Sequence, residues 1–330
     1  MRGLIVGLGS IGRRHLRNLR QLMPDADITV LRHQHSAGES ESQNLADRVV
    51  YELDEALDMA PEIAIIASPA PFHIQTALQL ARANTHLLLE KPISDRLDGV
   101  DELIRICRRG NLALLIGYTL RFYSPLRAAR EAIRSGRIGR VIGFQSEVGQ
   151  YLPDWRTGVP YQDVVTARRN MGGGVLLELS HELDCARWLV GEVRAISATA
   201  QRVSDLEIDV EDWAELSVHF ADGVIGHIHL DMVQRVPTRR CRVIGTDGTL
   251  SWEAASNRVA CYSSAKRDWE EVSPAAEVDR NEMYVRELQH FLACVRGEAS
   301  PEVTGEDGKR ALQIALAARR SSETQRTVEL

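Results

Sequence analysis

Short apolar runs alternate with helical patterns through the first 118 residues, and this rhythm constrains the fold more than any other feature. The runs at 3–8, 27–32, 48–51, 62–68, 86–90 and 112–118 are mostly continuously apolar, as parallel strands buried on both faces are. Helical patterns fit between them, beginning at Ser10 and covering 71–84 and 95–109. This alternation predicts an α/β fold with a doubly wound parallel sheet.

The hexapeptide GLGSIG, residues 7–12, follows the first expected strand and opens the first expected helix. Gly7 would allow a tight turn, Gly9 would let the backbone approach a pyrophosphate, and Gly12 would allow close packing of helix on strand. The phosphates would rest on the helix N-terminus, where free N–H groups and the helix dipole favour an anion. This context predicts dinucleotide binding, with a merely tight turn as the alternative.

The end of the second expected strand bears on which dinucleotide is bound. NAD sites usually place an Asp or Glu there for the ribose 2′-hydroxyl, whereas an Arg accommodates the 2′-phosphate of NADP. Arg32 closes this strand, and no acidic residue follows it until Glu39. The sequence therefore favours NADP over NAD, with Arg32 against the phosphate. Alternatively, Arg32 stacks on the adenine or points into solvent.

Glu90, Lys91 and Pro92 lie at the carboxyl end of the fifth expected strand. Open α/β sheets bind their ligands at this edge, so we expect Lys91 to point towards the nicotinamide and the substrate. Pro92 restricts the residues before it to extended geometry. A solvated loop is the alternative for such a charged pair.

Four stretches in order resemble the glucose–fructose oxidoreductase, inositol dehydrogenase and MocA family: residues 7–16, 67–94, 117–144 and 243–253. The resemblance implies a Rossmann domain at residues 1–120 and a C-terminal α+β domain with an open, mostly antiparallel sheet at 121–330. It implies an NAD(P)-dependent oxidoreductase that acts on CH–OH groups. It also implies a catalytic or substrate-orienting Lys91 and further cofactor contacts from Ser10, Ile11, Ser68, Pro69, His73 and Glu90.

The segment GGGVLLELSHELD, residues 172–184, is the candidate second half of the site. A helical projection predicts an apolar stripe of Leu179, Leu183, Ala186 and Val190, with His181, Asp184 and Trp188 on the opposite side. The family pattern resembles G-G-G-x-x-x-D-x-G-x-H-x-x-D, and here Glu178 and Ser180 replace the usual Asp and Gly. A plain surface helix is the alternative.

The hypothetical chemistry is hydride exchange between a substrate carbinol carbon and the nicotinamide. His181 is the preferred general acid or base, because the pKa of an imidazole is near working pH. The Lys91 ammonium would stabilise a developing alkoxide or share the proton relay. Glu178 or Asp184 would orient His181 or bind a substrate hydroxyl, and Arg121 is a further expected substrate contact.

Residues 151–170 combine aromatic side chains with arginines and resemble an ordered binding loop. Aromatic faces pack on sugar rings and guanidinium forks suit carboxylates or phosphates, so Trp155 and Arg156 are expected substrate contacts. The resemblance favours a sugar, in particular a nucleotide sugar of surface-polysaccharide metabolism. Alternatives are a lid or dimer contact for the loop, and an inositol or a non-sugar substrate. A non-catalytic NADP(H)-binding sensor or assembly subunit is the alternative for the whole protein.

Composition excludes several other classes of protein. The net charge of -6 gives no reason to expect nucleic acid or an anionic membrane as partner. Five scattered cysteines without a Cys-x-x-Cys pair argue against a disulfide scaffold and fit a reducing cytoplasm. We expect no metal, because the segment SHELD lacks the H-E-x-x-H pattern. Neither a signal peptide nor a run of about 18 apolar residues is apparent.

The remaining C-terminal pattern predicts a sheet with one covered face. Runs at 194–203, 213–220, 224–232, 239–245 and 249–253 alternate polar and apolar residues, with a hairpin turn at 221–223. The free face would suit a homodimer or homotetramer contact, and His227 and His229 are expected at the sheet surface. A helix is expected near Glu306, followed by an exposed polar tail.

Overall fold

The chain forms two compact units, seen here in a computed structural model that describes residues 1–33, 44–156, 158–273 and 279–330. Unit 1 consists of Met1–Thr119 and Arg280–Lys309, and unit 2 consists of Leu120–Asp279 and Arg310–Leu330. A simple division of the chain after residue 120 would place residues 280–309 in the second unit. This segment groups with unit 1, where its helix α8 (Glu282–Val295) packs on α1 (Ser10–Leu22).

Unit 1 is built on a six-stranded sheet with the order β3-β2-β1-β4-β5-β6. Its strands are β1 (Arg2–Val6), β2 (Asp27–Leu31), β3 (Arg48–Val50), β4 (Ile63–Ile66), β5 (His86–Leu89) and β6 (Leu114–Ile116). Every neighbouring pair is parallel, which confirms the predicted doubly wound sheet. The strand order reverses between β1 and β4, and sheets of this kind bind ligands at that switch point.

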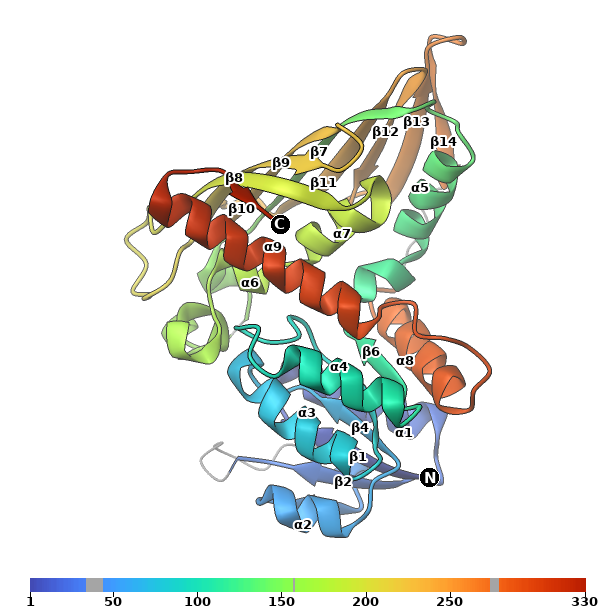
Figure 1. Cartoon of the computed structure of the whole chain (residues 1–330), viewed down its shortest axis with the longest axis vertical. Coiled ribbons are helices and arrows are strands. Elements are labelled where there is room, and N and C mark those ends of the chain that lie inside the picture. Colours follow the sequence, from blue (N-terminus) through green and yellow to red (C-terminus); the bar gives the residue numbers. More distant parts are fainter. Residues whose placement is uncertain (34–43, 157, 274–278) are drawn as a thin grey trace. The chain divides into compact units, whose positions relative to one another are not determined.

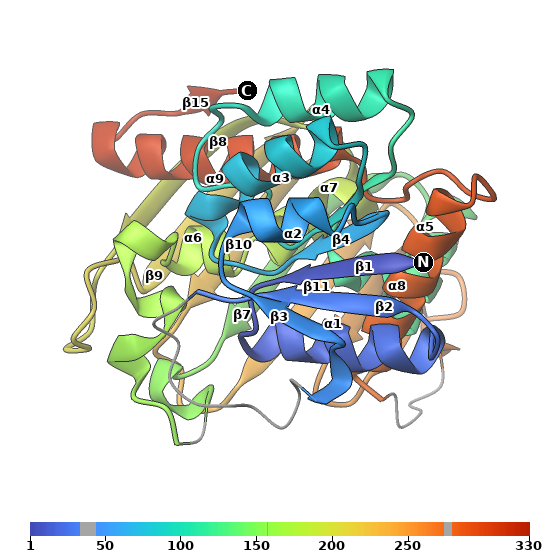
Figure 2. The same cartoon turned by 90° about the horizontal axis from the view of Figure 1, so that it is seen from below.

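Helices cover both faces of this sheet. The remaining helices of unit 1 are α2 (Leu53–Asp58), α3 (His73–Arg82) and α4 (Val100–Arg109). Figure 2 shows α1 and α8 on one face and α2, α3 and α4 on the other. Helix α4 illustrates the local reasons: its first turn is acidic and its last turn basic, which complements the helix dipole. Its buried positions recur at the spacing of one helix face: Val100, Leu103, Ile104 and Cys107.

Unit 2 is built on a nine-stranded sheet with the order β14-β13-β12-β11-β7-β10-β9-β8-β15. The strands are β7 (Val141–Gly149), β8 (Val193–Gln201), β9 (Trp213–Phe220), β10 (Ile225–Asp231), β11 (Thr238–Gly245), β12 (Gly248–Glu253), β13 (Arg258–Ser263), β14 (Asp268–Ser273) and β15 (Val328–Glu329). Only β7 and β10 pair in parallel among these strands, so the predicted mostly antiparallel sheet is confirmed.

The helices of unit 2 pack along one face of its sheet (Figure 1). They are α5 (Ser124–Arg134), α6 (Val175–Glu178), α7 (His181–Val190) and the part of α9 (Gly305–Thr324) that belongs to this unit. Alternate residues of β9 and β10 are buried, as a sheet covered on one face requires. Within the described residues, no helix is long and apolar enough to cross a membrane.

The C-terminal segment corrects one prediction. Its last side chains are largely exposed, as expected, but Val328 and Glu329 form β15 and pair with β8. The hydroxyls of Ser321 and Ser322 accept hydrogen bonds from backbone N–H groups of β8 at 2.9 and 2.8 Å. These bonds hold the end of α9 against the sheet, so the tail continues as a strand.

Candidate active site

The glycine loop of unit 1 has the geometry that a pyrophosphate needs. Gly7 has a φ of +88°, and a Cβ on Gly12 would lie 2.0 Å from the carbonyl oxygen of Gly7. A Cβ on Gly9 would meet no atom of the described chain within 4 Å, so the backbone there is open to approach. Helix α1 begins at Ser10, and Ile11 is its second residue. Its N-cap residue is Gly9, so no side chain caps the first N–H groups of the helix. The first N–H groups of α1 are therefore available to an anion at the switch point.

His73 joins the loop after β4 to the segment after β5. Its Nε2 lies 2.7 Å from the Ser68 carbonyl oxygen and its Nδ1 lies 3.0 Å from that of Pro92. The ring is buried, and burial lowers the pKa of His73 despite these two hydrogen bonds. The structure thus brings Ser68 and His73 together with the residue that follows Lys91. The cofactor contacts expected from Ser68, Pro69 and His73 stay predictions.

Arg32 follows β2 and is buried, with 9% of its surface exposed. Its backbone N–H donates to the Val50 carbonyl at 3.0 Å, which fixes the chain at this point. The alternative in which Arg32 points freely into solvent is therefore wrong. Glu39 lies outside the described residues, so the structure does not test its distance from this site.

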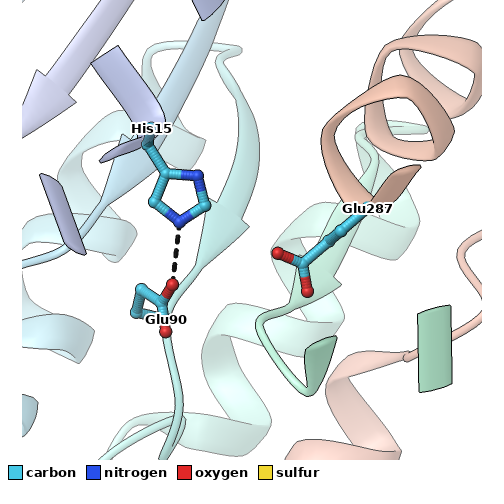
Figure 3. Close-up of side chains that lie close together, drawn as sticks. All are labelled: His15, Glu90 and Glu287. Atoms are coloured by element: carbon cyan, nitrogen blue, oxygen red, sulfur yellow. Dashed lines mark hydrogen bonds and ion pairs between the residues drawn. The ribbon is translucent and has the colours of Figure 1, made fainter. Parts of the chain in front are cut away.

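Glu90 lies at the end of β5 and is buried against His15 of α1. Its Oε1 is 2.8 Å from His15 Nε2 (Figure 3). Its Oε2 accepts the Lys91 backbone N–H at 3.2 Å. Burial raises the pKa of Glu90, but the hydrogen bond to His15 and the charges of His15 and Lys91 outweigh burial and leave the pKa lowered. Glu90 is therefore an ionised buried carboxylate, and its neighbour Lys91 is half-buried.

The segment Gly172–Asp184 of unit 2 is not one continuous helix. Gly174 has a φ of +102° and begins the short α6, while α7 begins at His181 after a break at Leu179 and Ser180. A φ of +102° is strained for any side chain, so Gly174 is required by its backbone conformation, and a Cβ there would also lie 2.5 Å from the Glu211 carboxylate. The glycines before α6 therefore have a local packing role.

The predicted faces of this segment need correction. Leu179 and Val190 of the expected apolar stripe are half-exposed, whereas Asp184 and Trp188 of the opposite side are buried. The reason is a long-range ion pair. Arg121 donates Nε–H and Nη2–H to the two Asp184 oxygens at 2.9 and 2.6 Å, and the two side chains are 6% and 1% exposed.

Glu178 and His181 keep partial exposure at the end of α6 and the start of α7. Within this segment, Glu182 is buried and accepts two hydrogen bonds from Arg239, at 2.7 and 3.1 Å. Both neighbouring acids, Glu182 and Asp184, are thus held by arginines. Glu178 and His181 are the predicted catalytic residues of unit 2 with access to solvent, and their roles stay predictions.

The described residues of the loop at 151–170 make specific contacts within unit 2. Trp155 Nε1–H donates to the Gln150 carbonyl at 2.9 Å, and the Arg235 guanidinium lies 3.6 Å from the Tyr151 ring centroid. Trp155 and Arg156 line a cavity of about 10 Å³, which is the size of one water molecule. This cavity alone is too small for a sugar ring, so contacts of Trp155 and Arg156 with a substrate stay a prediction.

His229 was expected at the sheet surface, and the structure corrects this. Its side chain is 13% exposed, with Nδ1 2.7 Å from Glu215 and Nε2 2.8 Å from Asp231. Burial lowers the pKa of His229, but the two carboxylates outweigh burial and raise it. His227 is 57% exposed, as predicted.

Two residues near Glu90 were not singled out from the sequence. His15 and Glu287 are both fully buried, and with Glu90 they place three polar atoms within 4.8 Å of one another. A sequence signal exists for Glu287, since it falls on the helix face that buries Leu288 and Phe291. A charged residue at a core position of an amphipathic helix indicates a specific partner or a bound proton.

The chain matches two family models along most of its length. Residues 1–118 match the oxidoreductase family with an NAD-binding Rossmann fold, and residues 126–251 match the GFO/IDH/MocA C-terminal domain. The chain belongs to the GFO/IDH/MocA family. It is therefore an oxidoreductase with an NAD-binding domain, which confirms the predicted family and enzyme class.

Individual relatives cover the whole chain. Myo-inositol 2-dehydrogenase of Thermotoga maritima is 27% identical over 100% of this chain and 98% of its own. A levoglucosan dehydrogenase structure with NADH and levoglucosan has a TM-score of 0.86 at 20% identity, covering 100% and 98% of the two chains. The WlbA dehydrogenase of Bordetella pertussis with NADH and UDP-GlcNAcA has a TM-score of 0.82 at 22% identity and the same coverage. These complexes contain NADH, so the comparisons do not support the predicted preference for NADP.

Proposed function

We propose that the protein is an NAD-dependent dehydrogenase that oxidises a CH–OH group of a sugar or cyclic polyol. The observation that carries the proposal lies within unit 1. The glycine loop opens at the switch point of the sheet, and Lys91 follows the carboxyl end of β5 beside the ionised Glu90. The family relatives named for inositol and levoglucosan support the substrate class.

Each residue of the proposed site has a distinct role. The dinucleotide, when bound, supplies the hydride acceptor. The N–H groups of Ser10 and Ile11 bind its phosphates, and Lys91 stabilises the charge that develops on the substrate oxygen. His181, half-exposed at the start of α7, serves as the general acid or base, and Glu178 binds a substrate hydroxyl.

Catalysis is tested with matched lysine and histidine variants. We expect Lys91→Met and His181→Asn each to lower kcat by about 10²–10⁴-fold, the usual contribution of a positioned acid or base. Lys266→Met is the control for Lys91, because Lys266 is an exposed lysine paired with Glu270. His227→Asn is the control for His181, because its side chain is 57% exposed. Equal losses in a control and its partner variant would refute the assigned roles.

The choice of dinucleotide is tested by fluorescence titration with NADH and NADPH. We expect NADH to bind more tightly, as the NADH-bound neighbours suggest. If NADPH binds more tightly and Arg32→Ala removes that preference, Arg32 recognises the 2′-phosphate as the sequence predicted. If neither dinucleotide binds, the interpretation of the glycine loop is wrong.

The substrate is identified by turnover on three classes of compound: inositols, anhydro sugars and UDP-linked amino-sugar acids. One structural neighbour, which contains UDP-GlcNAcA, supports the nucleotide-sugar prediction. Against it, Arg168 already bonds Asp163 at 3.0 Å, and Arg235 already covers the Tyr151 ring. We therefore expect turnover of a free polyol or sugar. Tight dinucleotide binding without turnover of any class would favour the sensor or assembly function. A homo-oligomer formed through the nine-stranded sheet stays a prediction.

A further inference from the structure

We propose that His15, Glu90 and Glu287 form a buried cluster in which Glu287 holds a proton and Glu90 carries the negative charge that balances the Lys91 ammonium. His15 and Glu287 are then positioning residues, because they act on Lys91 through Glu90. The inference rests on the proposed function in one respect: that function makes Lys91 the lysine that stabilises charge on the substrate oxygen. The protonation pattern itself can be measured without any substrate.

Three elements of unit 1 bring the cluster together. His15 comes from α1, Glu90 from the end of β5 and Glu287 from α8 (Figure 3). The figure shows the Glu287 carboxyl group directed towards the His15–Glu90 pair. A reciprocal pair of amide hydrogen bonds between Asn18 and Asn281, at 3.3 and 2.9 Å, ties α1 to the start of α8. The cluster is therefore built into the packing of these helices.

Glu90 and Glu287 have opposite hydrogen-bonding environments. Glu90 has His15 on one oxygen and the Lys91 N–H on the other, which favours its charged form. Both Glu287 oxygens are buried and have no hydrogen-bond partner in the described part of the chain. A charged carboxylate without partners is strongly disfavoured in the protein interior, so the proton belongs on Glu287.

The titration behaviour of the two acids agrees with this geometry. Burial, and secondly the nearby charge of Glu90, raises the pKa of Glu287 well above its ordinary value. The pKa of Glu90 is lowered, because His15 and Lys91 outweigh its burial. Two carboxyl groups that share one site divide in this way, with one acid neutral and one ionised.

Among the described residues, the charge that acts on Glu287 is that of Glu90. On its own helix, Tyr284 has its pKa raised to about 12 by burial, so its hydroxyl is neutral. From α1, the Arg14 guanidinium lies 4.5 Å from the Tyr284 ring centroid, and the edge of that ring meets His15. Glu90 and then Lys91 directly follow β5. A Cβ on Gly117 would lie 3.0 Å from Glu90 Oε2, so the backbone directly after β6 also confines the Glu90 carboxylate.

The consequence concerns the charge of Lys91. The charge of Lys91 favours the ionised form of Glu90, and this coupling is mutual. With Glu287 neutral, Glu90 is the one negative charge of the cluster, and both His15 and Lys91 favour that charge. An ammonium held in this way is what the proposed role at a developing alkoxide needs.

The chain offers an unusually direct test, because it has three lysines: Lys91, Lys266 and Lys309. Reductive methylation with ¹³C-formaldehyde gives each lysine an NMR signal that can be followed with pH and assigned by Lys→Arg variants. We expect Glu90→Gln to move the titration of the Lys91 signal to lower pH than in the unaltered protein, because the neighbouring negative charge is lost. We expect Glu287→Gln to leave it in place, because Gln preserves a neutral side chain. The signals of Lys266 and Lys309 are internal controls.

Several results would overturn the proposal. A shift of the Lys91 titration in Glu287→Gln comparable to that in Glu90→Gln would show that Glu287 is charged. If Glu90→Gln does not fold, infrared spectroscopy decides: the unaltered protein should show a carboxylic-acid C=O band near neutral pH that Glu287→Gln lacks. Absence of that band refutes the proposal. So does tight binding of Zn²⁺ or Mn²⁺ that is lost in Glu287→Gln, because the cluster would then bind a cation. All these measurements use the protein without substrate, so failure of the proposed dehydrogenase function would not affect them.

Discussion

The Arg121–Asp184 pair allows the sharpest test of the site, through the substitution Asp184→Asn. The pair is nearly fully buried, with exposures of 6% and 1%, and is joined by two hydrogen bonds of 2.9 and 2.6 Å. Asn keeps the shape but removes the charge that pairs with Arg121. Breaking a buried pair from one side costs about 3–5 kcal/mol. Asn retains one acceptor oxygen, so we expect a loss near the lower end, about 3 kcal/mol.

The loss is measured by urea or thermal unfolding, followed by fluorescence. Trp188 lies one turn after Asp184 on α7 and reports on this part of unit 2. About 3 kcal/mol corresponds to a fall in Tm of about 6–12 °C for a domain of this size. Asp163→Asn is the matched control, because its partner is also an arginine at 3.0 Å but the two side chains are 50% and 64% exposed. We expect less than about 1 kcal/mol there.

A loss below about 1 kcal/mol in Asp184→Asn would refute the structural role. Arg121 and Asp184 would then be the substrate contacts that the sequence predicted. In that case Asp184→Asn should raise KM for the substrate while the unfolding midpoint stays unchanged. Replacing both partners by apolar residues of similar size should recover much of the lost stability if the structural role is correct.

Three further predictions concern the glycine loop, the sheet histidine and the thiols. Gly12→Ala places a Cβ 2.0 Å from the Gly7 carbonyl oxygen, so we expect a loss of stability and at least about tenfold weaker NADH binding. Gly9→Ala should weaken NADH binding alone, because a Cβ there meets no atom of the described chain within 4 Å. The raised pKa of His229 means that its ion pairs stabilise the fold below about pH 6.5 and that this contribution is lost as pH rises through the raised pKa. His229→Gln should therefore lower Tm more near pH 6 than near pH 9, and equal losses would contradict the assignment. Cys185 and Cys241 are buried with raised pKa values, about 12 for Cys241, so native protein should not react with iodoacetamide at these thiols, as mass spectrometry of labelled peptides would show.

Many elements with a strong local pattern could be predicted, but helix α8 and strand β13 have such a pattern and were missed. The strands of unit 1 are continuously apolar, so their number and parallel arrangement followed from the sequence. The turn between β9 and β10 was also predicted from residues 221–223. In the structure Gly223 has a φ of +78° where the hairpin reverses. Strands β7, β13 and β14 were not predicted, and β14 is an edge strand whose side chains are mostly exposed and carry no apolar alternation. Helix α2 was missed because six residues are too few to show a helical period.

The sequence by itself determined the family, the glycine loop and the position of Lys91, because each depends on residues that are contiguous in the chain. Only the tertiary structure decided which charged residues are buried and paired. Asp184 is held by an arginine 63 positions away, and Glu287 meets Glu90 from a helix near the other end of the chain. A helical projection assigns polar residues to the solvent side, because it contains no information on distant partners. The free energy of a buried charge depends on those partners, and the fold alone brings them together.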